Sequence, residues 1–365
     1  MTRPIFAVIN TNALKHNLQL IKNITSKSKI WSVIKADAYG HGIKNVWKSL
    51  IQTDGFAVLT LDEAILLRKY GCNKPILLLE GIFHLKDLDI IYKYNFTITI
   101  HSYWQLNMLI LNKPKYPIDI YIKINSGMNR LGFNIKNISK IIDIIKIIKI
   151  KNITFMAHFA NTSYKNYKVI NNIINTINNN IINTINNNII KYNFLRSFAN
   201  SAAILWHPQT YYDWVRPGII LYGASPTGNW NDIKKNKIIP VMTLNSEIIS
   251  IQKLLPGNTV GYNDVYHTNK YRRIGIIACG YADGYPRNIS NNTPILVDGH
   301  VTKILGDISM DMIAVDLINI PNANIGSKVE LWGENIKIDD IAQSANTIGY
   351  EIMCSLSKRV PIFIK

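Results

Sequence analysis

Several positions in the first two-thirds of the chain carry residue types that can bind or activate a substrate. They are Lys35, Lys123, His158, the pair Asn200-Ser201, and Arg216 with Gly218 just beyond it. Each follows a short run rich in apolar residues, which is typical of the end of a buried strand. A lysine amine can form a Schiff base with an aldehyde cofactor, and a histidine can exchange protons. Hydroxyl and backbone N–H groups can bind a phosphate.

The runs that precede these residues belong to a longer alternation of strands and helices. The candidate strands are Ile30–Lys35, Phe56–Leu59, Pro75–Leu79, Phe96–Ile100, Ile118–Ile124, Ile153–His158, Leu195–Ala199 and Trp214–Arg216. Helical stretches between them indicate parallel βαβ units. Eight such units predict an α/β fold, an eight-stranded parallel (β/α)8 TIM-type barrel. Active sites of such barrels lie at the carboxyl ends of the strands, where these polar residues should meet.

The pattern changes after about residue 230. The candidate strands there are Val241–Leu255, Arg272–Cys279, Pro294–Val297, Val301–Leu305 and Lys328–Trp332, with turn pairs at Pro256-Gly257 and Asp298-Gly299 and one helical segment near Ile338–Thr347. We therefore predict a barrel domain over residues 1–230 and a β-rich C-terminal domain over residues 231–365. The run Ile5–Ile9 could pair with either domain.

One segment, Ile170–Ile190, is rich in Asn and Ile and low in complexity. Such tracts can be disordered. The spacing of the isoleucines nevertheless allows an apolar stripe along a helix. We favour a helix between the sixth and seventh strands over a functional tract.

Length and composition allow a sizeable buried core. The chain has 365 residues, of which 47% are hydrophobic, enough for a barrel and a second domain. No apolar run approaches the ~20 residues that span a bilayer, so we expect no membrane partner. The N-terminal segment is interpreted as a strand, not a signal peptide. Three widely separated cysteines without metal-ligand spacing predict a cytoplasmic protein and no metal site.

The net charge of +18 does not by itself identify a partner. Most of the excess is lysine dispersed along the chain, and it accompanies heavy use of Ile and Asn, which A/T-rich codons also encode. A basic nucleic-acid-binding protein is the alternative of a different class, but no basic block supports it. Salt-sensitive binding without a cofactor would be needed to favour that alternative.

The segment Ser-Val-Ile-Lys-Ala-Asp-Ala-Tyr-Gly-His-Gly at residues 32–42 resembles the cofactor-lysine segment of alanine racemases. The resemblance continues, in order, through residues 123–133, 158–161, 200–203, 215–223, 260–263, 280–287, 309–311 and 349–351. It covers the chain from about Ile5 to Pro361. It implies a pyridoxal-phosphate-dependent isomerase that racemises alanine and supplies D-alanine for peptidoglycan.

The resemblance implies roles for the cofactor-binding residues. Lys35 would carry pyridoxal 5'-phosphate, and Arg216 would face the pyridine nitrogen with His158 orienting it. The phosphate would be bound by Tyr39, Ser201, the backbone of Gly218 and Ile219, and Tyr350. An arginine at the pyridine nitrogen disfavours transamination, because its proton is too tightly held to pass to the ring. Related barrel decarboxylases generally present a carboxylate there, so Arg216 argues against that class.

The resemblance also implies the catalytic and substrate-binding residues. Lys35 and Tyr262 of the partner subunit would be bases on opposite faces of the substrate, as racemisation requires, so a complete site implies a homodimer. Arg130 would contact the substrate carboxylate, and Lys123 stands where many relatives have a carbamylated lysine that orients this arginine. Met310 and Asp311 of the partner subunit would line the substrate end, with Tyr281 narrowing the entrance.

A narrow pocket formed by Tyr262, Tyr350 and Met310 suits a methyl side chain. The alternative within the same class is a broader-specificity racemase that acts on serine or a basic amino acid. The chain departs from many relatives at Ser163, Asp307 and Asn125, where they have an acidic residue, an arginine and an aspartate respectively. The resemblance places Ser163 and Asp307 in the entry corridor, whose charge they alter, and Asn125 in the central motif; none of the three departures removes a catalytic group.

Overall fold

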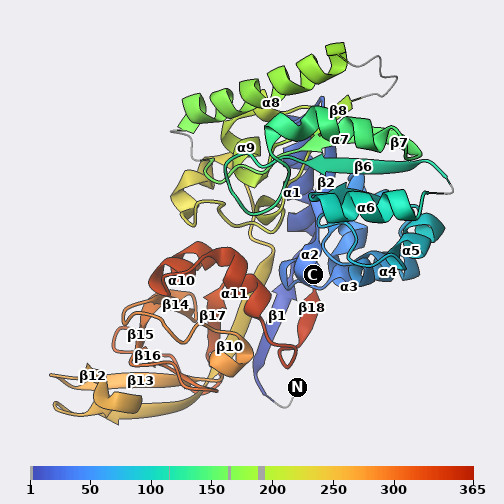
Figure 1. Ribbon diagram of the computed structural model, residues 1–365. Helices are drawn as coiled ribbons and strands as arrows, with labels where there is room; N and C mark the ends of the chain where they lie inside the picture. The colour runs from blue at the N-terminus through green and yellow to red at the C-terminus, as the bar shows by residue number, and fades with distance from the viewer. Residues whose placement is uncertain (1–2, 115, 163–165, 188–193) are drawn as a thin grey trace. The chain divides into compact units, whose positions relative to one another are not determined.

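The computed structural model describes residues 3–114, 116–162, 166–187 and 194–365 (Figure 1). The chain forms two compact units. The barrel unit comprises Leu18–Ala38 and Leu50–Gly218, and the β-rich unit comprises Met1–Asn17, Tyr39–Ser49 and Ile219–Lys365. Each unit contains its own eight-stranded sheet.

The sheet of the barrel unit is parallel throughout, in the order β8-β7-β6-β5-β4-β3-β2-β9. Its strands are β2 (Lys29–Val33), β3 (Gly55–Val58), β4 (Ile76–Leu78), β5 (Thr97–Ile100), β6 (Ile118–Lys123), β7 (Ile150–Met156), β8 (Phe194–Ser197) and β9 (Trp214–Val215). The N–H of Arg216 donates to the carbonyl oxygen of Ala199 at 2.9 Å, which joins the segments that follow β8 and β9. The sheet is thus nearly closed, and the predicted barrel is confirmed.

Burial explains why these runs are strands. Every residue of β3, β4 and β5 is buried, as expected for parallel strands covered by side chains on one face and helices on the other. The helices of this unit are α4 (Leu61–Lys69), α5 (Asp87–Tyr94), α6 (Tyr103–Leu111), α7 (Ile138–Ile145), α8 (Tyr167–Asn187) and α9 (Ser201–Trp206). Thr60 and Glu63 form a capping box that starts α4 directly after β3.

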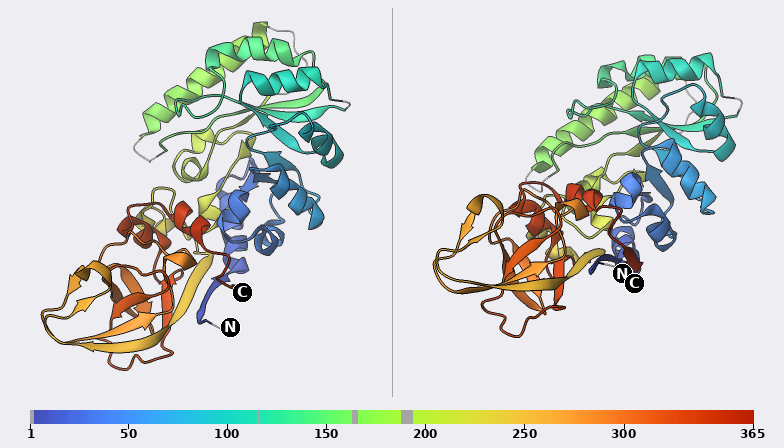
Figure 2. Two further views of the ribbon diagram at one scale, coloured as in Figure 1. Left: turned by 60° about the horizontal axis from the view of Figure 1, so that its bottom comes forward. Right: turned by 90° about the horizontal axis from the view of Figure 1, so that it is seen from below.

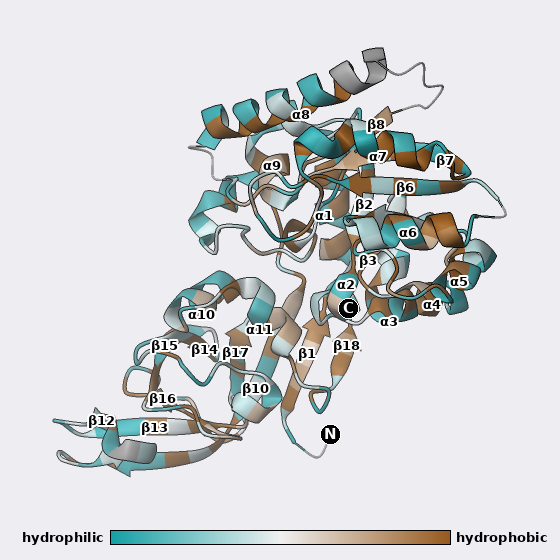
Figure 3. Cartoon of the chain, viewed as in Figure 1, coloured by the Kyte–Doolittle hydropathy of each residue, from teal (hydrophilic) through white to brown (hydrophobic). Residues whose placement is uncertain are grey.

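The Asn- and Ile-rich tract forms α8, so the predicted helix is confirmed through Asn187. Figure 3 shows apolar and polar residues alternating along this helix. The buried positions Ile170, Ile174, Ile177 and Ile181 follow the helical period and make one apolar stripe. Residues 188–190 of the tract lie outside the described residues.

The sheet of the β-rich unit has the order β13-β16-β15-β14-β17-β10-β1-β18, and β13 also pairs with β10, so six of its strands close into a ring. Its strands are β1 (Ile5–Ile9), β10 (Met242–Leu254), β13 (Arg272–Ile277), β14 (Pro294–Val297), β15 (His300–Leu305), β16 (Ile313–Asp316), β17 (Lys328–Trp332) and β18 (Ile362–Ile364), beside a hairpin of β11 (Thr259–Val260) and β12 (Tyr266–His267). The ring is antiparallel.

The first strand, β1, belongs to this β-rich unit. It pairs antiparallel with β10 and parallel with β18, so strands from both ends of the chain share one sheet. In Figure 2 the dark-blue first strand runs beside the yellow β10. Of the two pairings that the sequence left open for Ile5–Ile9, the structure shows the one with the C-terminal strands.

Short helices complete the chain. They are α1 (Thr11–Ile24), α3 (Ile43–Val46), α10 (Ile338–Ser344) and α11 (Gly349–Ser355), with 3-10 helices that include η5 (Ile219–Leu221), η8 (Tyr262–Asp264) and η9 (Tyr281–Asp283). The segment labelled α2 (Lys35–Tyr39) is a turn with left-handed backbone. No helix within the described ranges is long and apolar enough to cross a membrane.

Candidate active site

The barrel places the predicted strand-end residues together at one end. Lys35 lies two residues beyond β2, Lys123 ends β6, and Arg216 follows β9 directly. His158 lies two residues beyond β7, and Ser201 begins α9 four residues beyond β8. Because all eight strands run in the same direction, these residues share the carboxyl end of the barrel, where such folds build their active sites.

Arg216 is a buried cation held by the ends of two neighbouring strands. Its side chain is only 5% exposed. Nη1 donates to the carbonyl oxygen and to the hydroxyl of Ser197, at 2.5 and 2.6 Å, and Nη2 donates to the carbonyl oxygen of Ala157 at 2.6 Å. Burial lowers the pKa of Arg216 to about 10, so the guanidinium still holds its proton at neutral pH.

His158 is held in its neutral form. Burial, followed by the positive charges of Arg216, Arg130, Lys123 and Lys35, lowers its pKa to about 3. We expected His158 to hydrogen-bond to Arg216, but among the described residues the guanidinium donors of Arg216 go to Ser197, Ala157 and Phe198 instead. Arg216 acts on His158 through its charge, and the orienting role of His158 toward Arg216 stays a prediction.

A small cleft brings Lys123, Arg130 and His158 together. It is also lined by Asn125, Ser126 and Met128. Burial and the nearby charges of Arg216 and Arg130 lower the pKa of Lys123 to about 8, while Glu80 opposes this shift. Several basic side chains thus line one small cleft, and the pKa of Lys123 is close enough to 7 that part of its amine is neutral at neutral pH.

The loop after β6 is shaped by Asn125. Its side-chain oxygen accepts the N–H groups of Gly127 and Asn129, each at 3.1 Å, and its amide donates to Asn129. The side chain of Asn125 therefore organises this loop. At Gly132 the chain comes back to the start of the loop with φ +117°. A Cβ atom at this position would lie 2.7 Å from the backbone of Asn125, so glycine is required. Ser126 joins the loop to the next strand by donating to the carbonyl oxygen of His158 at 2.8 Å.

Ser201 and Gly218, two residues of the predicted phosphate site, are hydrogen-bonded to each other. The N–H of Gly218 donates to Oγ of Ser201 at 2.9 Å, and both residues are buried. Asn200 caps α9 by accepting the N–H of Ala203 at 3.0 Å, which fixes Ser201 as the first residue of that helix. Ile219 follows immediately and starts the 3-10 helix η5.

The segment after Lys35 is a left-handed turn built without glycine. Ala36, Asp37, Ala38 and Tyr39 have φ between 49° and 56°. Left-handed backbone costs an L-residue roughly 1–2 kcal/mol, so four in succession store considerable strain. The N–H of Ala38 returns to the carbonyl oxygen of Ile34 at 2.9 Å. The turn therefore fixes the chain directly next to Lys35.

In the β-rich unit, Tyr39 and Tyr350 lie near each other. Their ring centroids are 5.9 Å apart, and Tyr39 stacks on Tyr222 at 4.6 Å. Burial raises the pKa of both hydroxyls, so they stay protonated and can donate hydrogen bonds. Burial also raises the pKa of Asp339 to about 7, although the N–H of Ser225 stabilises its carboxylate.

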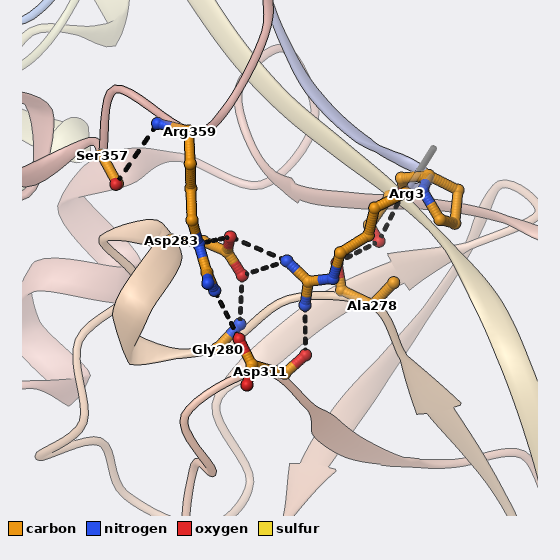
Figure 4. Close-up of polar contacts among 9 residues, drawn as sticks. Arg3, Ala278, Gly280, Asp283, Asp311, Ser357 and Arg359 are labelled. Carbon is orange, nitrogen blue, oxygen red and sulfur yellow. Dashed lines mark hydrogen bonds and ion pairs between the residues drawn. The ribbon is translucent and has the colours of Figure 1, made fainter. Parts of the chain in front are cut away.

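Three further predicted residues of the β-rich unit have exposed side chains. Tyr262, Tyr281 and Met310 are 68%, 38% and 53% exposed. The backbone before Tyr262 runs against the segment after β15, since a Cβ on Gly261 would lie 3.6 Å from Asp307. Asp311 is bound through its carboxylate by Arg359 at 2.5 Å (Figure 4).

Comparison with known proteins agrees with this fold over the whole chain. Residues 9–226 match the family model for the alanine racemase N-terminal domain, and residues 241–364 match the model for the C-terminal domain. The chain belongs to the alanine racemase family. An alanine racemase of Erwinia tasmaniensis is 51% identical, over 99% of both chains.

Solved structures of alanine racemases have the same fold as this chain over nearly its whole length. The biosynthetic alanine racemase of Pseudomonas aeruginosa has a TM-score of 0.91 at 33% identity, over 100% of this chain and 99% of that one. The alanine racemase of Bartonella henselae, determined with covalently bound pyridoxal phosphate, has a TM-score of 0.87 at 27% identity, over 99% of each chain.

Two features of the site were not predicted from the sequence. Ser197, which binds Arg216 through its hydroxyl and carbonyl groups, is the last residue of β8, and its place at a strand end was the only signal. The left-handed turn at Ala36–Ala38 contains no glycine that could have marked it. Ser163 lies outside the described residues.

The strain after Lys35 gives a first prediction. Ala36→Gly should raise the free energy of unfolding by up to about 1 kcal/mol, because glycine adopts positive φ without a Cβ clash and Ala36 is exposed. Ala64→Gly, in the right-handed helix α4, should lower it by at least about 1 kcal/mol. Urea denaturation measures both. Destabilisation by Ala36→Gly would contradict the assigned strain.

The buried amine of Lys123 gives a second prediction. Its pKa is depressed from 10.5 to about 8, so the folded state disfavours the charged form. This cost is fully present below pH 8 and disappears as the pH rises toward 10.5. Lys123→Met should therefore stabilise the protein by at most roughly 3 kcal/mol near pH 7, and the gain should shrink between pH 8 and 10.5.

The comparison needs urea denaturation of both proteins without cofactor, in buffer free of carbon dioxide, at several pH values. A difference between variant and wild type that does not change with pH would contradict the depressed pKa of Lys123.

Proposed function

We propose that this chain interconverts L-alanine and D-alanine by a two-base reaction that depends on pyridoxal 5'-phosphate, with Lys35 and Tyr262 of the partner subunit as the bases. The observation that carries the proposal is the buried, protonated Arg216 among Lys35, Lys123 and His158 at the carboxyl end of the barrel. The chain also belongs to a family of isomerases whose members use this cofactor.

The residues present fit the cofactor. Lys35 supplies an amine for an aldehyde. The positive charges that lower the pKa of His158 and Lys123 favour a ligand with several negative charges, such as a phosphate, a phenolate and the substrate carboxylate. Ser201 accepts a hydrogen bond from Gly218, which leaves the hydroxyl hydrogen to be donated to an anion.

The two bases would act on opposite faces of the substrate. Pyridoxal phosphate, when bound, supplies an electron-withdrawing ring that makes the α-proton of an amino acid acidic. Nζ of Lys35 would remove or deliver that proton on one face of Cα, and Oη of Tyr262 of the partner subunit would do so on the other. The exposure of Tyr262 within its own β-rich unit leaves it available to a second copy.

Arg216 would set the type of reaction. It keeps its proton at neutral pH, because its pKa is about 10, and its remaining hydrogen-bonding capacity can face the pyridine nitrogen. An arginine there donates a hydrogen bond but no proton. This weakens the electron sink and favours racemisation over transamination. The bonds to Ser197 and Ala157 hold the guanidinium in place for this role.

The other predicted residues would bind the remaining groups. Tyr39, Tyr350, Ser201 and the backbone of Gly218 and Ile219 would bind the phosphate. Arg130 would bind the substrate carboxylate and the phenolic oxygen. The lowered pKa of Lys123 favours the neutral amine, which can react with carbon dioxide to give a carbamate and release a proton. That anion would relieve the repulsion between Lys123 and Arg130.

At the substrate end, Met310 and Asp311 of the partner subunit would line the pocket, and Tyr281 would narrow its entrance. The homodimer, the supply of D-alanine for peptidoglycan and a cytoplasmic location also remain part of this proposal. A broader-specificity racemase is the alternative within the class. The nucleic-acid-binding alternative rests on the net charge of +18 alone.

The function is tested by D-alanine formation from L-alanine with and without added pyridoxal phosphate. Cofactor-dependent racemisation is the expected result, with serine, lysine and arginine turned over much more slowly. Comparable turnover of any of these would favour the broader-specificity alternative. Failure to form D-alanine from a protein that has bound the cofactor would overturn the assignment of alanine.

A third prediction concerns Tyr262. Tyr262→Phe removes one base and should lower racemisation by at least about 100-fold, while the bound-cofactor absorbance persists. Tyr271→Phe is the matched control, because Tyr271 is an exposed tyrosine of the same β-rich unit and should keep wild-type rates. Unchanged rates in both directions for Tyr262→Phe would eliminate the two-base assignment.

A further inference from the structure

One buried carboxylate ties together distant segments of the β-rich unit. The side chain of Asp283 is fully buried, between the guanidinium groups of Arg3 and Arg359 (Figure 4). Nη1 of Arg3 donates to both carboxylate oxygens at 2.8 Å, and Nε of Arg359 donates to Oδ1 at 2.7 Å. We call Arg3, Asp283 and Arg359 the arginine clamp.

The two arginines of the clamp also bind a second loop, the one that contains Asp311. Nη2 of Arg359 donates to the carboxylate of Asp311 at 2.5 Å, and Nη2 of Arg3 donates to the carbonyl oxygen of the same residue. Each guanidinium therefore bridges the loop around Asp283 and the loop around Asp311. An arginine that binds two acceptors at once fixes their relative orientation, because its donors form a rigid planar fork.

The same two loops are joined by backbone hydrogen bonds. The N–H of Tyr281 donates to the carbonyl oxygen of Ser309 at 3.1 Å, and that of Ala282 donates to Met310 at 3.0 Å. The two loops can lie this close together only because residue 280 is glycine: a Cβ atom there would lie 2.3 Å from the carbonyl oxygen of Met310. The N–H of Gly280 also donates to Asp283 at 2.9 Å, so the clamp and the loop contact share one network.

The two loops carry the exposed side chains of Tyr281 and Met310. From this arrangement we infer that Arg3 and Arg359 are positioning residues that hold Tyr281 and Met310 at a fixed separation and so set the width of the substrate entrance. The inference rests on the proposed function, which assigns both side chains to the substrate end. Under the proposed function these side chains contact the substrate and take no part in the proton transfer, so loosening this pair should weaken alanine binding more than it slows turnover.

The clamp combines a fully buried carboxylate with two arginine side chains that are 32% and 43% exposed. Loss of one arginine would therefore reduce stability as well as loosen the loops, because a buried charge needs a partner. The same unit contains another pair, between Arg272 and Asp316, whose side chains are 14% and 5% exposed. That pair joins the start of β13 to the end of β16, outside the loops that carry Tyr281 and Met310. It therefore provides a control for the loss of an ion pair.

The test compares Arg359→Gln and Arg359→Lys with Arg272→Gln. The lysine variant keeps the charge but cannot bind Asp283 and Asp311 through a planar fork, and it serves if the glutamine variant fails to fold. Two measurements are made: hydrogen–deuterium exchange at the amides of Tyr281 and Ala282 in the cofactor-free protein, and kcat and KM for alanine in the holoenzyme.

Both Arg359 variants should exchange these amides faster and raise KM about tenfold, with kcat changed by less than about threefold. Arg272→Gln should leave the exchange of these amides and KM unchanged, whatever its effect on thermal stability. Unaltered exchange and KM in the Arg359 variants, or the same rise of KM in Arg272→Gln, would overturn the inference while wild-type racemisation upheld the proposed function. Absence of racemisation by the wild type would overturn the proposed function and the entrance role together.

Discussion

Buried positive charge at the carboxyl end of the barrel is the constraint on which the candidate site depends. A guanidinium that is 5% exposed must have acceptors, and Ser197 and Ala157 provide them from the neighbouring strands. The same charge, together with burial, keeps His158 neutral and brings the pKa of Lys123 to about 8. A site so rich in cations and donors is suited to a ligand that carries several negative charges, and Arg216 keeps its own proton because its pKa is still about 10.

The two units contribute different kinds of residue. The barrel unit supplies Lys35 and the cations on rigid strand ends, whereas the β-rich unit carries Tyr262, Tyr281 and Met310 on exposed loops. Rigid elements position reacting groups accurately, and loops normally do so less well. The strained turn after Lys35 and the arginine clamp each fix a segment that the regular strands do not hold.

Much of the barrel could be predicted because buried parallel strands are continuous apolar runs, and all eight were located from such runs. Once the barrel was predicted, the polar residues at the strand ends were expected to meet at its carboxyl end. By contrast, β16 and the helix α11 were missed, since Ile313–Asp316 and Gly349–Ser355 are short and lack clear periodicity. The clamp could not be predicted, because Arg3 and Asp283 are 280 positions apart and no local pattern records such a contact. The partners of Arg216 were missed for the same reason.

The proposed site is complete only when Lys35 of one subunit meets Tyr262 of the other. The test is to mix and reassociate two inactive variants, Lys35→Ala and Tyr262→Phe, and to measure D-alanine formation. Random exchange of subunits makes half of the dimers mixed, and each mixed dimer has one site with both bases intact. We expect activity to return to about a quarter of the wild-type level. If both bases came from the same chain, every site in the mixture would lack one of them, and the mixture would stay inactive.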